Sequence, residues 1–182
     1  MKISRSLLGS VRHFLRAEDG IAATEFALIA PLMITLYFGV TELSDALTAS
    51  SKVTSMASAA ADLVAQADAI HNSDVNDVFS ALNAIMFPYG KNDTKIVISS
   101  LIDAGNGNVK VAWSDAQNAT ARSVGSVVTI PTGLVTAGGS VILAEVTYNY
   151  SSPAGKLIFG VVPFSDTFYL RPRKVAQVER DP

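Results

Sequence analysis

A predominantly apolar run covers residues 21–40 of the 182-residue chain, and Glu25 is the single ionisable side chain in it. In a helix, which rises ~1.5 Å per residue, this run spans ~30 Å, the thickness of the hydrocarbon core of a bilayer. A soluble domain rarely needs an apolar run of this length. The pattern therefore predicts a transmembrane helix near the N-terminus.

Residues 41–70 continue the helical period beyond this run. No proline interrupts them, and alanine, the best helix former, is abundant. Joined to the apolar run, they predict one helix of ~50 residues, either packed on a head domain or standing as a plain stalk. The apolar positions that recur at helical spacing are Leu43, Leu47, Met56, Ala60, Val64 and Ala67.

A second, shorter helix is predicted between a break at His71 and a stop at Pro88 and Gly90. Ser73 or Asp74 can cap its N-terminus. Its apolar face is expected to comprise Val75, Phe79, Leu82 and Met86, with Val78 and Ile85 alongside.

Apolar and polar positions alternate in much of the remaining chain, which predicts β-strands. We expect strands at residues 96–102, 109–113, 126–130, 141–150 and 167–178, the last bent or held at an edge by Pro172. Residues 115–125 and 151–165 are predicted loops, and the second contains an apolar LIFGVVPF segment that the pattern does not place. Val109, Val111 and Trp113 are expected on one face of their strand. Another shared face comprises Ile142, Ala144, Val146, Tyr148 and Tyr150.

Helices followed by consecutive strands indicate an α+β fold. The predicted architecture is a long N-terminal helix, with a transmembrane half and an exposed half, joined to an antiparallel β-sheet head domain. The DAGNGN sequence at residues 103–108 is expected to form a hairpin turn within this sheet.

Charge is unevenly distributed, although the net charge is only −2. Residues 1–20 hold Lys2, Arg5, Arg12 and Arg16, whereas the twenty residues after Leu43 hold one basic side chain. The positive-inside rule therefore places the N-terminus in the cytoplasm and the C-terminal domain across the membrane. The mildly acidic remainder argues against nucleic acid as a partner.

A secretory signal peptide would give a similar pattern. Its apolar region is shorter, about 7–15 residues, and ends at a small-residue cleavage site. The best match to such a site here, at residues 45–49, is poor.

Gly20 indicates a cut on the other side of the run, because it ends a charged leader and the apolar helix begins at once. This arrangement resembles type IV prepilins, in which a prepilin peptidase cuts after the glycine at the cytoplasmic face. An acidic pair and the glycine, Glu18, Asp19 and Gly20, are followed by Glu25, Phe26 and Pro31. With these residues, the sequence over positions 14–45 resembles, more specifically, TadE/TadG-like proteins of the tight-adherence (Tad, Flp) pilus system.

The resemblance implies processing between Gly20 and Ile21, and roles in subunit register and assembly for Glu25, Phe26 and Pro31. Cleavage would create an ammonium group at Ile21, one helical turn from Glu25 or close to the Glu25 of a neighbouring subunit. Pairing between subunits would fix their axial stagger. In the alternative interpretation, Glu25 extends to the cytoplasmic interface beside a leader arginine. Pro31 is expected to bend the helix.

Little in the sequence points to catalysis. The chain has no cysteine, and the predicted exported part has one histidine, His71, expected as a capping or solvated residue. The DAGNGN turn carries oxygen ligands, but it lacks the spacing and final glutamate of an EF-hand. A membrane-anchored enzyme would need a carboxylate pair, such as Asp103 and Asp115, to converge in a cleft. We predict no enzymatic activity, cofactor, metal or small-molecule substrate.

Arg171, Arg173 and Lys174 form the only basic cluster after the apolar run. They are a candidate contact patch for acidic residues of a neighbouring subunit or for anionic lipid. The alternative is a solvated edge strand, where charge and proline block further strand pairing.

The predicted organisation has four parts: a basic cytoplasmic leader (1–20), a transmembrane helix (21–43), a helical extension (44–72) and a periplasmic α+β head (73–182). We expect a minor pilin or pseudopilin of the bacterial inner membrane, with a structural role in pilus assembly, priming or adhesion. Its expected partners are the prepilin peptidase, other Tad pilus subunits and assembly-platform proteins. The alternative is an uncleaved, single-pass, membrane-tethered periplasmic scaffold or binding protein.

Overall fold

The structure is a computed structural model that describes residues 19–103, 105, 108–152 and 160–181. The chain forms two compact units, Met1–Leu43 and Ser44–Pro182, which we call the N-terminal unit and the head. Most of the predicted leader, with Glu18 and the four basic residues before it, lies outside the described residues. So do parts of the DAGNGN turn and of the LIFGVVPF segment, at residues 104, 106–107 and 157–159.

One continuous helix, α2 (Asp19–Ala65), contributes to both units. It is 47 residues long and confirms the predicted long helix, although it ends five residues before position 70. Within the described part of the chain, α2 is the one helix that is long and apolar enough to cross a membrane. In the N-terminal unit its side chains are exposed almost all round.

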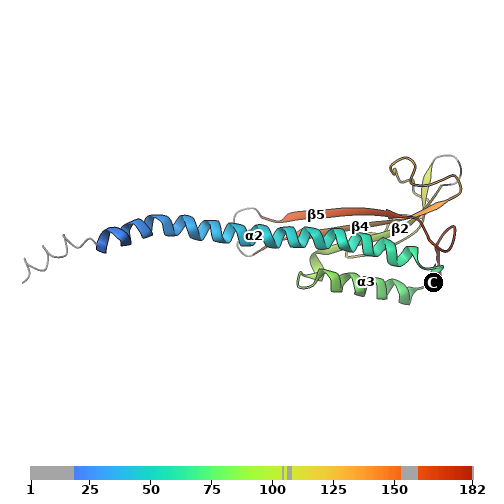
Figure 1. Cartoon of the computed structure of the whole chain (residues 1–182). Helices are drawn as coiled ribbons and strands as arrows, with labels where there is room; N and C mark the ends of the chain where they lie inside the picture. The colour runs from blue at the N-terminus through green and yellow to red at the C-terminus, as the bar shows by residue number, and fades with distance from the viewer. Residues whose placement is uncertain (1–18, 104, 106–107, 153–159, 182) are drawn as a thin grey trace, which may run out of the picture. The chain divides into compact units, whose positions relative to one another are not determined.

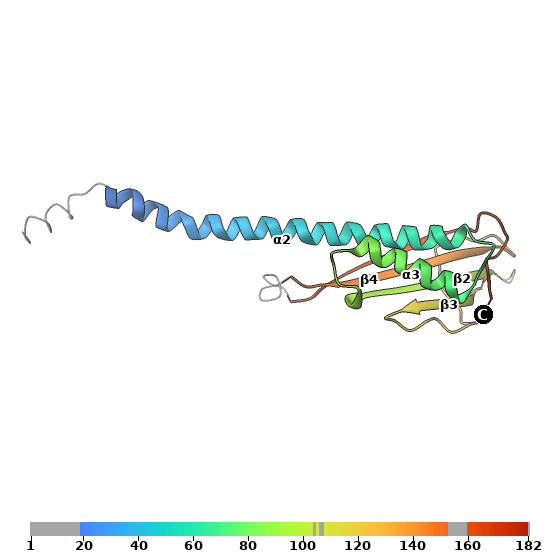
Figure 2. The same cartoon turned by 90° about the horizontal axis from the view of Figure 1, so that it is seen from below.

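The head is an α+β domain with a four-stranded antiparallel sheet in the order β3-β2-β4-β5. The strands are β2 (Thr94–Asp103), β3 (Val109–Gln117), β4 (Ser140–Tyr150) and β5 (Val162–Leu170). The head part of α2 and helix α3 (Asn72–Met86) lie side by side along one face of this sheet (Figures 1 and 2). A short 3-10 helix, η1 (Lys91–Asp93), precedes β2, and two-residue strands β1 (Ala69–Ile70) and β6 (Glu179–Arg180) pair in parallel. The predicted fold class is confirmed.

The main core fills the space between the two helices and the sheet. Met56 of α2, Leu82 and Met86 of α3, and Ile96 and Ile142 of the sheet are all fully buried. Five alanines of α2 are also fully buried and let its backbone approach its neighbours closely: Ala49, Ala57, Ala60, Ala61 and Ala65. The predicted face of β4 is confirmed, since all five of its residues belong to this core. A second, smaller core consists of Leu101, Val109, Val111, Val141 and Leu143.

Two of the apolar positions that recur at helical spacing in α2 are not buried, since Leu43 and Leu47 are each 60% exposed. The buried stripe of α2 runs instead through Ala49, Val53, Met56 and Val64. The first buried residues of this stripe, Ala49 and Val53, are small, so a search for large apolar side chains selects the wrong positions.

The predicted N-cap of the second helix, Ser73 or Asp74, is also wrong by two or three residues. Helix α3 begins at Asn72, and the residue at its N-cap position is His71. Asp74 lies in the first turn, where its Oδ2 accepts a hydrogen bond of 2.9 Å from the backbone N–H of His71. The apolar face of α3 is confirmed, because Phe79, Leu82 and Met86 are buried.

Strand β3 contains a bulge that separates residues predicted to share a face. The register passes from Ser100–Trp113 to Leu101–Val111, so Ala112 is an extra residue. Because the side-chain period is two, the bulge turns Trp113 toward the helix-covered core while Val111 belongs to the smaller core.

Two strand predictions are wrong. Residues 126–130 form no strand and make only an isolated bridge between Val127 and Lys110. The last long strand covers Val162–Leu170, not 167–178, because it pairs with β4 from Tyr150 back to Ile142. Pro172 therefore lies beyond the strand. Residues 171–181 form instead a C-terminal strap, which bonds to the end of α2 through Arg173 N–H and Ala65 O at 2.9 Å.

Candidate functional site

The residues predicted to act in assembly all lie in the first turns of the described part of α2. Ile21 and Glu25 are four positions apart and therefore share one face of the helix. Glu25 is exposed, as are Phe26 (67%) and Ile21 (59%). The geometry thus places the predicted processing bond one helical turn from the only ionisable side chain of the apolar run.

Pro31 lies inside α2 without ending it. Since proline has no backbone N–H, the carbonyl of Ala27 lacks its usual donor at this turn. One turn further on, the Thr35 hydroxyl donates to the carbonyl of Pro31 at 2.8 Å. Such a helix is tolerated in lipid when a neighbouring helix satisfies the freed carbonyl.

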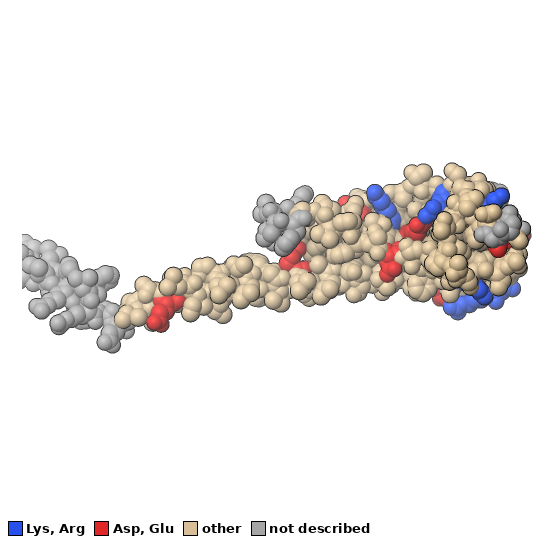
Figure 3. Space-filling model, turned by 90° about the horizontal axis from the view of Figure 1, so that it is seen from above, with Lys and Arg blue, Asp and Glu red and all other residues tan. Residues whose placement is uncertain are grey.

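Large apolar side chains surround the helix of the N-terminal unit on every side. A helix that is hydrophobic all round belongs in a membrane or among other apolar helices. In the view of Figure 3 the described part of this unit shows acidic atoms and no basic ones, whereas the head shows scattered patches of both. Its most exposed large apolar residues are Phe26, Leu28, Leu32, Tyr37, Val40 and Leu43.

Two of the three basic residues of the candidate contact patch make contacts within the head. Arg171 donates to the carbonyls of Leu134 and Gly133, at 2.9 and 3.2 Å. Arg173 forms an ion pair with Asp62 of α2. Lys174 is exposed. These bonds give the arginines a structural role in attaching the C-terminal strap, and a contact with a partner remains a prediction.

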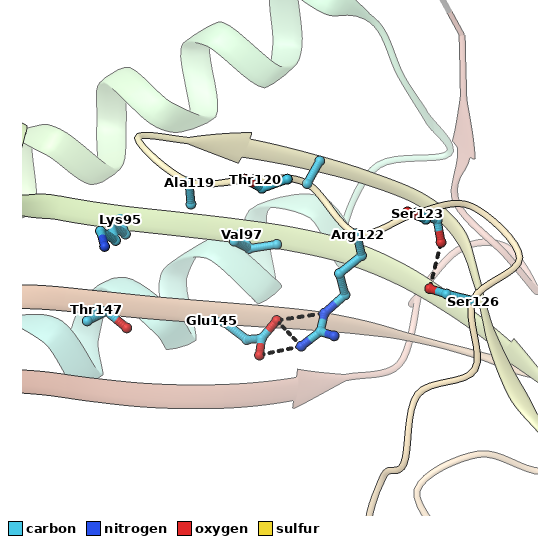
Figure 4. Close-up of a pocket in the computed structure, with 10 residues that line it drawn as sticks. Lys95, Val97, Ala119, Thr120, Arg122, Ser123, Ser126, Glu145 and Thr147 are labelled. Carbon is cyan, nitrogen blue, oxygen red and sulfur yellow. Dashed lines mark hydrogen bonds and ion pairs between the residues drawn. The ribbon is translucent and has the colours of Figure 1, made fainter.

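A groove of about 510 Å³ on the sheet face opposite the helices was not predicted from the sequence. Figure 4 shows Arg122 reaching across β2 from the connection that follows β3 toward Glu145 of β4. Arg122 Nη2 lies 2.7 Å from Glu145 Oε1, and Nε lies 2.9 Å from Oε2. The remaining lining consists largely of hydroxyl-bearing and small side chains with Lys95.

The Arg122–Glu145 pair is bidentate, which is the strongest geometry for an exposed ion pair. Hydrogen bonding to Glu145 raises the pKa of Arg122, so its charge is fixed at any physiological pH. The backbone N–H of Arg122 also bonds to Ser114 Oγ at 3.0 Å, and Ser114 bonds to Ser99. The groove is therefore a polar surface that anchors a loop. A lone carboxylate within β4 is the sequence signal that could have revealed it.

Aromatic side chains cluster at the end of the head where the chain leaves the N-terminal unit. Tyr89 lies 5.8 Å from Tyr148 and 6.4 Å from Tyr150 between ring centroids, and Phe164 joins the cluster beside Tyr150. The Tyr89 hydroxyl donates to the carbonyl of Asp45 at 3.1 Å. Burial raises the pKa of both Tyr89 and Tyr148.

The residues considered for chemistry are not brought together. In the β2–β3 ladder Asp115 faces Ile98, five residues along the strand from Asp103, and it forms an ion pair with Arg180 at 2.8 Å. Asp103 Oδ1 accepts the backbone N–H of Gly105 at 2.9 Å, as in a hairpin turn. Among the described residues no three His, Cys, Asp or Glu side chains are grouped as a metal site would require.

These features define a class of protein: a single apolar helix suited to membrane anchoring, continuous in sequence with an α+β head. Residues 20–62 match the family model described as TadE-like protein, so the chain carries a TadE-like segment. The predicted resemblance is confirmed over this segment, which extends from Gly20 into the buried part of α2. TadE-like proteins are structural pilus components. No curated protein and no solved structure matches the chain.

Proposed function

We propose that this protein is a minor pilin or pseudopilin of a Tad pilus, anchored by residues 21–43 and processed after Gly20. The observation that carries the proposal is the position of the TadE-like segment. It covers one helix, which is apolar and exposed in the N-terminal unit and contributes buried residues to the main core in the head. Such a helix joins a membrane segment to a folded domain without a linker.

The proposed mechanism is structural. A carboxylate at the centre of a membrane helix costs ~2.5–3.5 kcal/mol, and less near the end, so Glu25 needs a compensating charge. Processing would supply one as the new ammonium group of Ile21. In a bundle of subunits, only one axial stagger brings the ammonium of one chain to the Glu25 of the next. The Ala27 carbonyl freed by Pro31 offers the same bundle an acceptor.

The proposed organisation is a cytoplasmic leader (1–20), a membrane helix (21–43), a helical extension (44–72) and a periplasmic head (73–182) in the bacterial inner membrane. The proposed partners are the prepilin peptidase, other pilus subunits and the assembly platform. The cysteine-free sequence allows a direct test of orientation. A Val124→Cys variant should react with a membrane-impermeant maleimide added to spheroplasts, because Val124 is 73% exposed in the head.

The mature N-terminus tests processing. Intact mass and N-terminal peptide mapping of the membrane fraction should show a chain that begins at Ile21, and Gly20→Ala should retain the leader. A methyl group added at Gly20 would have no neighbouring atom within 4 Å, so this substitution leaves the helix intact. A chain that still begins at Met1 would refute processing.

The second candidate function is an uncleaved periplasmic scaffold, favoured by the polar groove beside Arg122 and Glu145. It predicts that Glu25→Ala leaves function unchanged. The pilin proposal predicts loss of incorporation into the pilus fraction, while Thr24→Ala, an adjacent exposed substitution without a charge, should assemble normally. Equal incorporation of both variants would favour the scaffold.

A further inference from the structure

Phe87 is the most exposed large hydrophobic residue described in the head, at 76% of its surface. It follows the last residue of α3 and occupies the C-cap position of that helix. Pro88 beside it is also exposed. Burying the apolar surface of this side chain would be favourable, a contribution that exposure to water forgoes.

Hydrogen bonds hold this exposed turn firmly in place. The backbone N–H of Phe87 donates to Ala84 O at 3.3 Å, and its carbonyl accepts the ammonium of Lys52 at 2.8 Å. Two residues on, the Tyr89 hydroxyl donates to the carbonyl of Asp45. The turn is thereby fastened to the first turns of α2 within the head.

Chain connectivity limits the distance between Asp45 and the end of the apolar run. Asp45 is five residues after Val40, the end of the apolar run, which corresponds to ~7.5 Å in a helix and at most ~18 Å in a fully extended chain. The headgroup layer outside the hydrocarbon core is ~5–7 Å thick on each side of a bilayer. Aromatic side chains are enriched at that depth.

We propose that Phe87 is a membrane-contact residue: its ring enters the headgroup layer of the bilayer that holds residues 21–40 and seats the head on the lipid surface. The proposal rests on the membrane anchoring proposed above. The ring itself is uncharged, and the carboxylates of Asp45 and Asp93 lie near Tyr89 and Tyr148. The ammonium of Lys52 is bonded to the carbonyls of Ile85 and Phe87, so the proposed contact does not require anionic lipid. Val162, 37% exposed, begins β5 opposite Tyr150 at the same end of the sheet, and Val161, 54% exposed, precedes it.

The experiment uses the full chain in phosphatidylcholine nanodiscs loaded with one chain per disc, which removes contacts between copies. Nitroxide labels are attached to single cysteines in three variants: Phe87→Cys, Val124→Cys and Leu32→Cys. Val124 is the matched control, because it is 73% exposed and its neighbour Gly125 donates to Val111 O at 2.8 Å, toward the opposite end of the sheet. Leu32 reports the apolar run. Fluorescence of the buried Trp113 checks that each variant is folded.

Oxygen partitions into lipid and a nickel chelate stays in water, so their relaxation effects separate the outcomes. We expect the ratio of oxygen to nickel accessibility at position 87 to be several-fold above that at 124 and below that at 32. Equal ratios at 87 and 124, with lipid exposure at 32, would overturn the membrane contact and leave the anchor intact. Low accessibility to both reagents at 87 would show that protein covers Phe87, which also overturns it. Water exposure at 32 would refute the anchor itself.

Discussion

Lys52 provides a sharp test of how the two helices of the head are joined. Its ammonium group donates to the carbonyls of Ile85 and Phe87, at 2.7 and 2.8 Å. These carbonyls lie in the last turn and at the C-cap of α3, where helix carbonyls lack intrahelical donors. The last turn of α3 contains no basic residue of its own, so a lysine of α2 supplies the cation.

The Lys52→Met variant removes this charge and keeps most of the aliphatic stem. A hydrogen bond to a charged group contributes ~1.5–3 kcal/mol, and a cation at a helix C-terminus adds ~0.3–1 kcal/mol. The bond to Ile85 is half-buried, so its loss should cost almost the full free energy of such a bond. The bond to Phe87 is exposed, and in the variant water can take the place of the ammonium there. We therefore expect a loss of ~2 kcal/mol, or roughly 6–8 °C in the midpoint of thermal unfolding for a domain of this size.

Thermal and urea unfolding of the full chain in detergent micelles, followed by the fluorescence of Trp113, measures this loss. Lys110→Met is the matched control, since Lys110 is exposed on β3, and it should change stability by less than ~0.5 kcal/mol. Amide exchange at Phe87 and Tyr89 should accelerate only in the Lys52 variant. A Lys52→Met chain as stable as the control would refute the assignment of this contact as a helix cap.

Three further predictions concern the head. Leu82→Ala, at a fully buried position, should cost ~2–5 kcal/mol in urea unfolding, whereas Leu47→Ala at 60% exposure should cost less than ~0.5 kcal/mol. A double-mutant cycle of Arg122→Met and Glu145→Gln should give a coupling of ~0.5–1 kcal/mol that weakens with salt, because both side chains are about a third exposed. Burial raises the pKa of Tyr89, so the stability it contributes is complete below pH ~10 and is lost as pH rises through the folded-state pKa. Tyr89→Phe should reduce this alkaline destabilisation and remove a late-titrating phenol from the tyrosinate absorbance.

Local periodicity was sufficient to predict most of the elements. The period of 3.6 identified α3 and its buried face, and the period of two identified β4, whose five core residues are those of the alternating pattern. Helix α3 is amphipathic, and β4 alternates from Ala144 to Tyr150, so each turn or pair of residues there repeats the same signal. The same rule failed at Leu47, because α2 packs through alanines at the start of the head.

Features that depend on distant partners could not be predicted in this way. The bulge at Ala112 exists because β3 must align with β2 on both sides of it, which no pattern within β3 records. The C-terminal strap is held by Trp113 Nε1 donating to Val178 O at 2.8 Å and by Ser140 Oγ donating to Ala176 O at 2.6 Å. These bonds replace a strand ladder, and their acceptors are backbone carbonyls that any residue would provide. The alternating residues around Pro172 therefore led to the prediction of a strand where the structure has none.

Helix α2 has a different composition in its two parts, one suited to lipid and the other to a protein core exposed to water on one side. Before position 44 large apolar residues face outward on all sides, as lipid requires. In the head, alanines and Met56 face the core, and hydroxyl-bearing residues such as Ser51 and Ser55 face water. The TadE-like match spans both parts, so the matched segment must be apolar on its outer surface before position 44 and must pack in the core of the head after it. Substitutions can separate these two requirements. Changes at Glu25 should alter membrane behaviour and assembly without altering the unfolding of the head. Changes at Met56 should do the reverse.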